Sequence, residues 1–423
     1  MINTWQLSNG AKIVVEDIPY LRSAAIGVYI KVGSRYEESS MAGASHFIEH
    51  MLFKGTEKRT AKEIAENFES MGGQLNAYTA KEHTCVYART LDEDIYAAID
   101  IIFDMLFHAK FSARDYETER EVIVEEIGMY EDSPDELIHD VFAQHFWQGH
   151  ALGLPILGTL NSLKNMRQEE LVDFYHTHYV PANMVIAVAG NVDHHRIYEV
   201  IQGITDTNDP APNNFVQVPE RVLPFVSMLP KEIEQVQICM GVPGISFHDE
   251  NRYTQSVMNS IMGGGMSSRL YQCLREEQGL AYSVFSNAAS YSDTGVISIN
   301  IGTGTGKVER FFDALYEQLN ELMNKGVTTE EVNRTKKLMK SSILMGLEGV
   351  MNRMSRLGKG VLMYNQVTSP EETIEKINAV TEQQVNLYAA DYLQAGKVSM
   401  AAIGDKKILP AVEQAFTKWW GHR

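Results

Sequence analysis

Residues 46–56 of this 423-residue chain read HFIEHMLFKGT, and the first five place two histidines and a glutamate close together. If the stretch is helical, His46 and His50 project from one face, because side chains four residues apart lie one turn above each other. Two imidazoles at that spacing supply one edge of a tetrahedral zinc site. Glu49 lies on the adjoining flank, where it can reach a metal-activated water without binding the metal. The stretch therefore predicts a helix that carries two zinc ligands and a separate base.

A zinc site of this kind needs a third protein ligand, and a carboxylate is the usual choice. Candidates lie in residues 117–126, ETEREVIVEE. Glu119 and Glu126 are seven residues apart and share a helix face, whereas Glu121 and Glu125 project elsewhere. The apolar residues among them indicate a partly buried helix, in which an inward carboxylate needs a cation or hydrogen-bond donors. The alternatives are a solvated acidic face here and, for residues 46–50 alone, a helix with two partly exposed histidines.

The composition, with 44% hydrophobic and 22% charged residues, is ordinary for a soluble globular protein. The length suits two domains of about 200 residues each. There are 55 acidic and 37 basic side chains, which give a formal net charge of -18. Such a polyanion is a poor partner for phosphate backbones, so we expect no nucleic-acid partner. The charge could steer basic peptides toward the protein or only keep it soluble.

The cysteines and the apolar runs bear on location. The three cysteines are far apart and form no Cys-x-x-Cys pair, which argues against a disulfide framework and a thiolate zinc site. The first residues lack a basic segment followed by an apolar run, and no stretch of about 18 apolar residues occurs. The sequence therefore predicts a cytoplasmic protein with no membrane partner.

The periodicity of apolar residues predicts two halves of similar design. In the first half it predicts strands at 12–16, 24–30, 76–87 and 184–190 and helices at 46–52, 61–71, 94–108, 112–147 and 168–176. In the second half it predicts strands at 236–241 and within 282–301 and helices at 269–277, 308–323 and 329–345. We interpret this order as an α+β fold made by tandem duplication, each domain being a mostly antiparallel sheet packed with helices.

The composition changes between the two halves. Residues 205–224 accumulate Asp, Asn and Pro and show no apolar period, which indicates a linker or an ordered surface loop. The predicted division is a zinc-binding catalytic domain at 1–204, a linker at 205–224 and a second, similar domain at 225–423.

The chain resembles the inverzincin zinc metallopeptidases of the pitrilysin, insulinase and mitochondrial processing peptidase family, in particular its short bacterial processing-protease-like type. The family signature is His-x-x-Glu-His followed by a glutamate some 76 positions later, and 126 minus 50 is 76. Residues 51–56, residues 72–79 (GGQLNAYT) and residues 179–184 (YVPANM) also look like the family's own sequence. The resemblance spans nearly the whole chain.

The resemblance implies a zinc metalloendopeptidase that cleaves peptides or unfolded polypeptide segments. It implies that His46, His50 and Glu126 bind one Zn²⁺ per chain and that Glu49 is the general base. Glu119 matches a second acidic position of the family, to which we assign an electrostatic role beside the metal. A non-catalytic or partner-dependent subunit of a processing-peptidase-like complex is the alternative, although such relatives usually lack a ligand or the base.

Two further groups of residues are implied to contact the substrate. In relatives, the strand that matches residues 72–79 is a sheet edge that pairs with the extended peptide, which nominates Asn76, Ala77 and Thr79. An ordinary interior strand is the alternative. In the second half, which has no His-x-x-Glu-His, Arg275 and Tyr282 are seven residues apart and match a family pair that contacts substrate and the developing oxyanion. Their alternative is structural, with Arg275 paired to a carboxylate and Tyr282 in a core.

The short length also has an implication for partners. Long family members enclose a peptide substrate in a chamber built from four domains, and this chain holds two. The resemblance therefore implies a homodimer, or a dimer with a related subunit, that encloses a chamber. In such a dimer the Arg275 and Tyr282 pair could complete the partner chain's zinc site.

Overall fold

The structure, a computed structural model, describes residues 2–205, 217–220 and 223–421. The chain forms two compact units, each of which is described by itself. The first unit comprises Met1–Met129, Leu154–Gln217 and Leu344–Thr368. The second comprises Tyr130–Gly153, Val218–Ile343 and Ser369–Arg423. Each unit is therefore assembled from three separate stretches of the chain.

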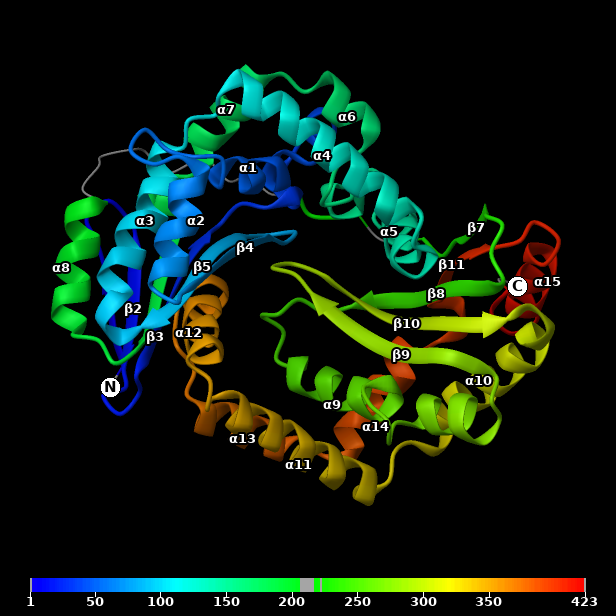
Figure 1. The fold of residues 1–423 in the computed structure, drawn as a ribbon. Coiled ribbons are helices and arrows are strands. Elements are labelled where there is room, and N and C mark those ends of the chain that lie inside the picture. Colours follow the sequence, from blue (N-terminus) through cyan, green and yellow to red (C-terminus); the bar gives the residue numbers. More distant parts are fainter. Residues whose placement is uncertain (1, 206–216, 221–222, 422–423) are drawn as a thin grey trace. The chain divides into compact units, whose positions relative to one another are not determined.

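The first unit is built on a six-stranded sheet (Figure 1). Its strands are β1 (Ile2–Gln6), β2 (Lys12–Asp17), β3 (Ser23–Ile30), β4 (Gln74–Thr79), β5 (Thr84–Leu91) and β6 (Met184–Gly190). Its helices are α1 (Ala44–Leu52), α2 (Ala61–Ser70), α3 (Ile95–His108), α4 (Ala113–Glu131, whose last two residues belong to the second unit), α6 (Leu160–Asn165), α7 (Gln168–His178), α8 (His194–Ile204) and α12 (Val350–Tyr364). The strand order is β1-β2-β6-β3-β5-β4, and only the β2–β6 pair is parallel.

The central strand β3 explains the layers of this unit, because its side chains are buried on both faces. Ile26 and Val28 point into the larger core, which they share with α1, α3 and α4. Ala25 and Tyr29 point the other way and pack against α12. The sheet is thus covered by helices on both faces, and the face opposite the α1 side depends on α12 (Figure 1).

The second unit is built on a five-stranded sheet of related design. Its strands are β7 (Val226–Pro230), β8 (Gln235–Gly244), β9 (Ala281–Ser290), β10 (Gly295–Gly304) and β11 (Ser399–Gly404). Its helices are α5 (Pro134–Phe146), α9 (Arg252–Gly263), a π-helix (Tyr271–Glu277), α10 (Val308–Lys325), α11 (Thr329–Gly346, whose last three residues belong to the first unit), α13 (Pro370–Ala379), α14 (Glu382–Tyr392) and α15 (Leu409–Trp420). The strand order is β7-β11-β8-β10-β9, with only β7 and β11 parallel.

The two sheets confirm the predicted fold class. Reading β2-β6-β3-β5-β4 against β7-β11-β8-β10-β9 gives the same chain order, the same directions and the same edge strand. The helix α1 follows β3 as α9 follows β8. The fold is therefore a tandem α+β duplication with mostly antiparallel sheets.

Helices are exchanged between the two halves of the chain. α12 comes from the second half of the sequence and packs on the sheet of the first unit. α5 comes from the first half, and its residues Ile138, Phe142 and Phe146 pack on β8 and β11 of the second unit. The compact units therefore differ from the predicted continuous domains 1–204 and 225–423. The predicted linker at 205–224 lies largely outside the described residues.

Two predicted elements were wrong in their extent. The strand predicted at 76–87 is a hairpin, in which β4 and β5 flank a turn at residues 80–83. The helix predicted at 112–147 is two helices, because the ring of Pro134 cannot continue a helix but suits the first position of the next one. Within the described residues, no helix combines the length and apolar character needed to cross a membrane.

Candidate metal centre and active site

The start of α1 is held by a buried carboxylate. Gly43 has a φ of 96°, a left-handed conformation that favours glycine, and α1 begins directly after it. Glu37, 4% exposed, accepts hydrogen bonds from the backbone N–H groups of Gly43 and Ser45, both at 2.7 Å. Burial raises the pKa of Glu37, and the two N–H donors oppose that shift. These bonds satisfy N–H groups at the helix N-terminus and set where α1 begins.

The apolar residues of α1 then decide which way the histidines point. Its large apolar side chains are fully buried in the core of the first unit: Phe47, Ile48, Met51 and Leu52. Because these residues occupy one side of the helix, His46, Glu49 and His50 lie on the remaining side, where they are partly buried.

The acidic residues of α4 are oriented by the same logic. Tyr116, Ile123 and Ile127 form a buried stripe along α4, and Glu119 lies in that stripe at 3% exposure. Glu126 lies one turn beyond Ile123, and its side chain is 39% exposed. Both carboxylates therefore face α1, as their spacing of seven residues predicts.

The two helices bring three candidate metal ligands together. The Oε2 atom of Glu126 lies 3.6 Å from Nε2 of His50 and 3.9 Å from Nε2 of His46. One ligand atom from each of the three residues lies within 4.8 Å of the others. The imidazole rings of His46 and His50 meet edge to face, with centroids 4.6 Å apart. Among the described residues, this is the one group of His, Cys, Asp or Glu with metal-binding geometry.

Glu119 orients one of these ligands. Its Oε2 atom lies 3.1 Å from Nδ1 of His50, and its Oε1 atom lies 2.6 Å from Nζ of Lys54. A proton on Nδ1 that points at Glu119 leaves Nε2 of His50 free to bind a metal, on the side where Glu126 lies. Glu119 is therefore not a ligand but a partner of one, and Lys54 balances its buried charge.

Glu49 is held separately from the three ligands. The hydroxyl of Thr79 in β4 donates a hydrogen bond to Oε2 of Glu49 at 2.5 Å. Burial raises the pKa of Glu49 and the charge of Glu126 adds to that rise, while Thr79 and His50 oppose it. Burial, followed by the charge of His50, lowers the pKa of His46 to about 4. The neutral imidazole that results is the form that binds a metal.

The donor set fits zinc. Two imidazoles and one carboxylate are a common set for a catalytic zinc, and a tetrahedral site places its ligand atoms between 3 and 4 Å apart, close to the separations found here. The carboxylate–histidine pair of Glu119 and His50 is a further feature of zinc sites. His46, His50 and Glu126 would hold the zinc, and Glu49 would remain free of it.

The predicted substrate strand lies next to this centre. β4 is the edge of its sheet, with β5 as its hydrogen-bonded neighbour. Asn76 is exposed, Ala77 is buried against the core, and Thr79 contacts Glu49. The edge position leaves a row of backbone N–H and C=O groups for another strand. Thr79 thus has a contact with Glu49 that the sequence alone did not predict.

Arg275 and Tyr282 belong to the second unit. Arg275 lies on the π-helix, its side chain is 44% exposed, and its guanidinium carbon lies 4.8 Å from the ring centre of Tyr271. Tyr282 lies on the edge strand β9 and is 75% exposed. The alternative in which Tyr282 packs in a core therefore does not apply, whereas the alternative for Arg275 keeps support, because its Nε lies 3.8 Å from Oε1 of Glu276. The roles of the pair toward the zinc residues stay predictions.

Sequence reasoning missed two residues that organise the centre, Lys54 and Glu37. Lys54 follows His50 by one helical turn, so its place in the family-like stretch 51–56 was an available signal. Glu37 precedes α1 by seven residues, and only the path of the chain brings it to the helix N-terminus. No local pattern would have found it.

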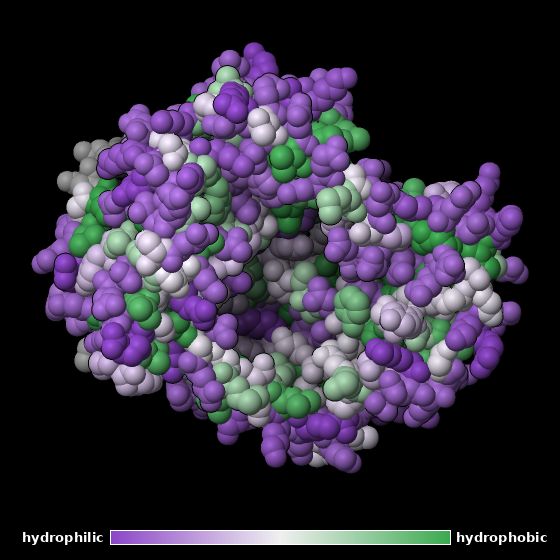
Figure 2. All heavy atoms as spheres, in the orientation of Figure 1, coloured by the Kyte–Doolittle hydropathy of each residue, from purple (hydrophilic) through white to green (hydrophobic). Residues whose placement is uncertain are grey.

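Two open grooves lie elsewhere on the first unit. One, of about 820 Å³, runs along α4 and α6 past Val122, Val124 and Leu160. Figure 2 shows apolar residues on the surface over these two helices. The other, of about 600 Å³, is lined by residues that include Tyr36 and Asp173. Neither groove contains the histidine and carboxylate ligands of the metal centre.

Comparison with known families matches both halves of the chain. Residues 12–160 match the family described as insulinase (peptidase family M16), and residues 165–339 match the peptidase M16 inactive domain. The first match contains all three candidate ligands and Glu49. The second contains Arg275 and Tyr282, in the half that has no His-x-x-Glu-His.

Several bacterial proteins are similar over nearly their whole length. An uncharacterized zinc protease of Bacillus subtilis (strain 168), YmxG, is 40% identical over 93% of this chain and 98% of that protein. Uncharacterized zinc proteases of Streptomyces coelicolor and Mycobacterium leprae are 36% and 37% identical, over 95% and 96% of this chain and 89% and 92% of theirs.

Solved structures share the fold at low sequence identity. A protease from Helicobacter pylori superposes with a TM-score of 0.90 at 19% identity, over 96% of this chain and 99% of that one. A peptidase M16 inactive domain from Pseudomonas fluorescens gives 0.89 at 19% identity, over 96% and 98%. A chain of Complex III2 from Candida albicans gives 0.84 at 20% identity, over 99% and 100%. At these identities the likeness establishes the fold alone.

Proposed function

This chain belongs to the insulinase family, peptidase family M16, and from that premise we propose that it is a zinc-dependent endopeptidase that cleaves peptides or unfolded polypeptide segments. The observation that carries the proposal is the pairing of a three-residue metal site with a glutamate that is not part of it. His46, His50 and Glu126 converge within 4.8 Å, and Glu49 is held beside them by Thr79. A structural zinc site needs no such free carboxylate.

The chemistry divides between the metal and the chain. When bound, zinc would supply a Lewis acid that activates water and polarises the scissile carbonyl. Glu49 would take a proton from the attacking water and pass it to the leaving amine, and its two oxygens suit this role because Thr79 occupies one of them. Burial of Glu49 makes it a stronger proton acceptor than an exposed glutamate. Arg275 and Tyr282 would donate hydrogen bonds to the developing oxyanion.

The edge strand supports an extended peptide as the substrate. A peptide that pairs with β4 would be bound through its backbone, which places little demand on its sequence. Thr79, at one end of β4, links that strand to Glu49 at 2.5 Å. A scissile bond near Thr79 would therefore lie near the base. Folded proteins expose few strands of this kind, so the proposal favours peptides and unfolded segments.

A digestion experiment tests the proposal. The purified protein is incubated with a mixed peptide library, with and without a zinc chelator, and the products are identified by mass spectrometry. We expect internal cleavage of peptides that stops with the chelator and returns when zinc is restored. Cleavage that survives removal of zinc, or cleavage only at peptide ends, would contradict a zinc endopeptidase.

The variant Glu49→Gln separates metal binding from catalysis. We expect it to bind zinc as the unmodified protein does and to lose activity by a factor of about 10² to 10⁴, because the amide cannot accept the water proton. Zinc content by elemental analysis and kcat/KM on a cleaved peptide are the measurements. A matched control is Glu121→Gln on the outer face of α4. Retained turnover in Glu49→Gln would remove Glu49 as the base.

We also propose that two chains, identical or related, act together and enclose the substrate. The pair Arg275 and Tyr282 lies outside the unit that holds the metal ligands, so it could serve its own chain or a partner. Mixing Glu49→Gln with a variant that lacks Arg275 and Tyr282 distinguishes these cases. Restored activity would show that the pair acts across a dimer, whereas an inactive mixture would show that it acts within one chain. Light scattering reports whether the dimer forms.

A non-catalytic subunit is the alternative from another class. It predicts that the purified chain cleaves no peptide even when zinc is bound. The presence of all three ligands, the orienting Glu119 and the held Glu49 favours the enzyme. A chain that gains activity only when a related subunit is added would be a partner-dependent peptidase.

A further inference from the structure

We propose that Lys359 makes the site select peptides with an acidic side chain at one position, the residue that lies opposite Tyr78 of β4. This inference rests on the proposed function in one respect, because it takes β4 as the strand that pairs with the peptide. It adds a specificity determinant that comes from α12, the helix contributed by the other half of the chain.

The side chains on the two faces of β4 lie in different surroundings, so a bound peptide would meet different groups on each face. Thr79 and Ala77 point to the α1 side, where Thr79 contacts Glu49 and Ala77 joins the core. Tyr78 points to the opposite side, where it pairs with Cys85 across the sheet and packs in the cluster formed with α12. Side chains of a peptide added to this edge alternate in the same way. The peptide side chain opposite Tyr78 therefore faces α12 and not the metal centre.

A lysine lies on that face. The Nζ atom of Lys359 is 5.6 Å from the centre of the Tyr78 ring, a distance typical of a cation–π contact. Lys359 is exposed, and among the residues that the structure describes it forms no ion pair or hydrogen bond with a carboxylate. Its ammonium group thus has no carboxylate to balance it there, although the chain as a whole carries a net charge of -18.

The neighbouring groups leave this positive charge uncompensated. The Tyr78 hydroxyl lies 3.2 Å from Nε2 of His83, and both side chains are neutral near pH 7. Glu82, the carboxylate in the same turn, lies 2.7 Å from a guanidinium nitrogen of Arg35. A carboxylate opposite Tyr78 would meet the ammonium of Lys359, whereas a basic side chain would meet a like charge.

Peptide binding tests the inference independently of cleavage. The probes are a neutral, unstructured parent peptide and a series in which each position in turn is Glu, Gln or Lys. Their affinities are measured by fluorescence anisotropy with the zinc-loaded Glu49→Gln protein, which should bind peptides without cutting them. The same series is measured after adding Lys359→Gln or Lys359→Glu to that background. The matched control is Lys164→Glu, which changes an exposed lysine of α6.

The expected result is a preference at a single position. There, Glu should bind about threefold more tightly than Gln, the size of a partly solvated ion pair. Lys359→Gln should remove the preference, and Lys359→Glu should reverse it in favour of Lys. The two flanking positions, whose side chains face α1, should not respond to residue 359. High salt should weaken the preference, and Lys164→Glu should leave it unchanged.

Several outcomes overturn the inference: no charge preference at any position, a preference that persists in Lys359→Glu, or one that Lys164→Glu changes equally. The proposed function fails separately. If the unmodified protein cuts no peptide but the charge preference depends on Lys359, the peptidase proposal is wrong and this inference stands. If peptides are cut but their binding does not depend on residue 359, the peptidase proposal stands and this inference is wrong.

Discussion

At the scale of single residues, the metal centre depends on partners that do not touch the metal. His50 can present Nε2 toward Glu126 because Glu119 accepts at Nδ1, and Glu119 is tolerated in a buried stripe because Lys54 lies 2.6 Å away. Glu49 is similarly directed by Thr79. His50 and Glu49 therefore each have a second residue that fixes the direction of the side chain.

The first prediction at this scale concerns Glu119. In Glu119→Gln, the side chain keeps its size, but it no longer offers a carboxylate to His50 and Lys54. We expect zinc affinity to fall by about 10- to 100-fold, the usual cost of losing such a partner. Competition with a chromophoric chelator measures the affinity. Glu121→Gln on the other face of α4 is the control, and equal affinities for the two variants would contradict the orienting role.

The second prediction concerns pH and His83. Burial, and then the charge of Lys359, lowers the pKa of His83 to about 4 in the folded protein. In the unfolded chain His83 binds a proton near pH 6.5, whereas in the folded protein it does so only near pH 4. The folded state therefore loses stability as the pH falls from about 6.5 to about 4. Between pH 7.5 and pH 5 this histidine alone should cost about 2 kcal/mol of unfolding free energy.

The variant His83→Gln isolates that contribution. Its free energy of unfolding in urea should decline by about 2 kcal/mol less than that of the unmodified protein between pH 7.5 and pH 5. Other acidic and basic groups contribute equally to both proteins and cancel in the comparison. Parallel pH profiles for the two proteins would show that His83 is protonated at its ordinary pKa.

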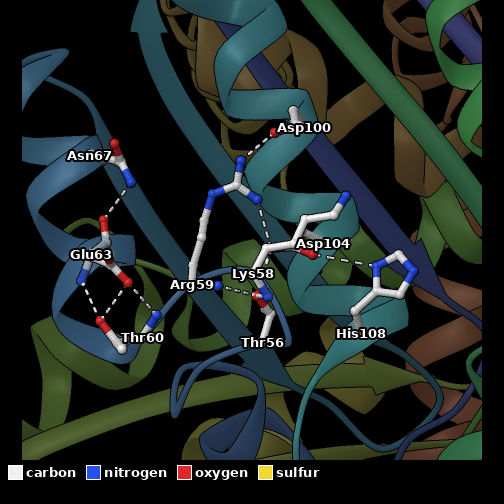
Figure 3. Close-up of polar contacts among 9 residues, drawn as sticks. All are labelled: Thr56, Lys58, Arg59, Thr60, Glu63, Asn67, Asp100, Asp104 and His108. Carbon is white, nitrogen blue, oxygen red and sulfur yellow. Dashed lines mark hydrogen bonds and ion pairs between the residues drawn. The ribbon is translucent and has the colours of Figure 1, made fainter.

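At the scale of elements, the loop between α1 and α2 is held by a polar cluster (Figure 3). Arg59 reaches from the loop to Asp100 and Asp104 of α3, with 2.6 Å to Oδ2 of Asp104. The hydroxyl of Thr56 donates to the same Asp104 oxygen at 2.6 Å. Asp104 is 3% exposed, so its charge depends on these donors. The loop also carries Lys54, which links the cluster to the metal centre.

The prediction for this cluster is a loss of stability. Arg59→Met should lower the free energy of unfolding by about 3 kcal/mol, because it removes the guanidinium from a buried carboxylate and leaves only Thr56 and the half-exposed His108 beside it. Adding Asp104→Leu should recover part of that loss, since no charge then remains to be satisfied. Arg167→Met removes an exposed ion pair at the start of α7 and should change stability far less, because solvent screens that pair. Similar losses in Arg59→Met and Arg167→Met would contradict the assignment.

Most elements of the first half could be predicted, and the failures have local causes. β2, β3, β6, α2 and α3 lie within one residue of their predicted bounds, since alternation and helical periodicity report directly on burial. The strand at 76–87 failed because the turn at residues 80–83 contains no glycine or proline to mark it. The helix predicted at 112–147 failed because the helical periodicity continues across Pro134, whose ring ends one helix and starts the next.

At the scale of the whole chain, the main finding is the exchange of helices. α12 supplies Val350, Met354, Leu357 and Val361 to the second face of the first sheet. The fit is close, since a Cβ at Gly358 would lie 2.1 Å from the ring of Tyr29. The first unit therefore needs residues from the C-terminal half. The cytoplasmic location, the dimer and the chamber stay predictions.

This exchange predicts the behaviour of a truncated protein. Residues 1–204, with residues 130–153 replaced by a flexible linker because α5 packs on the second unit, should aggregate or bind a hydrophobic dye, because α12 no longer buries Val14, Tyr29, Cys85 and Val185. Fusing residues 344–368 through a flexible linker should restore solubility and a cooperative thermal transition. A fusion with Leu357→Asp and Val361→Asp is the control and should fail. A well-folded 1–204 fragment would contradict the dependence on α12.

The sequence by itself determined the candidate ligands His46, His50 and Glu126, the base Glu49 and the duplicated α+β plan. The placement of the two histidines follows from a short-range period, because a helix places residues four apart on one face, whereas the choice of Glu126 over Glu119 and the role of Glu49 rest on the family resemblance. Only the tertiary structure decided that β4 is an edge, that Thr79 directs Glu49, that Lys54 balances Glu119 and that α12 covers the catalytic sheet. Those contacts join segments that are up to hundreds of residues apart in the sequence. Their energies depend on which apolar faces of the elements pack together. No local pattern in the sequence encodes that choice.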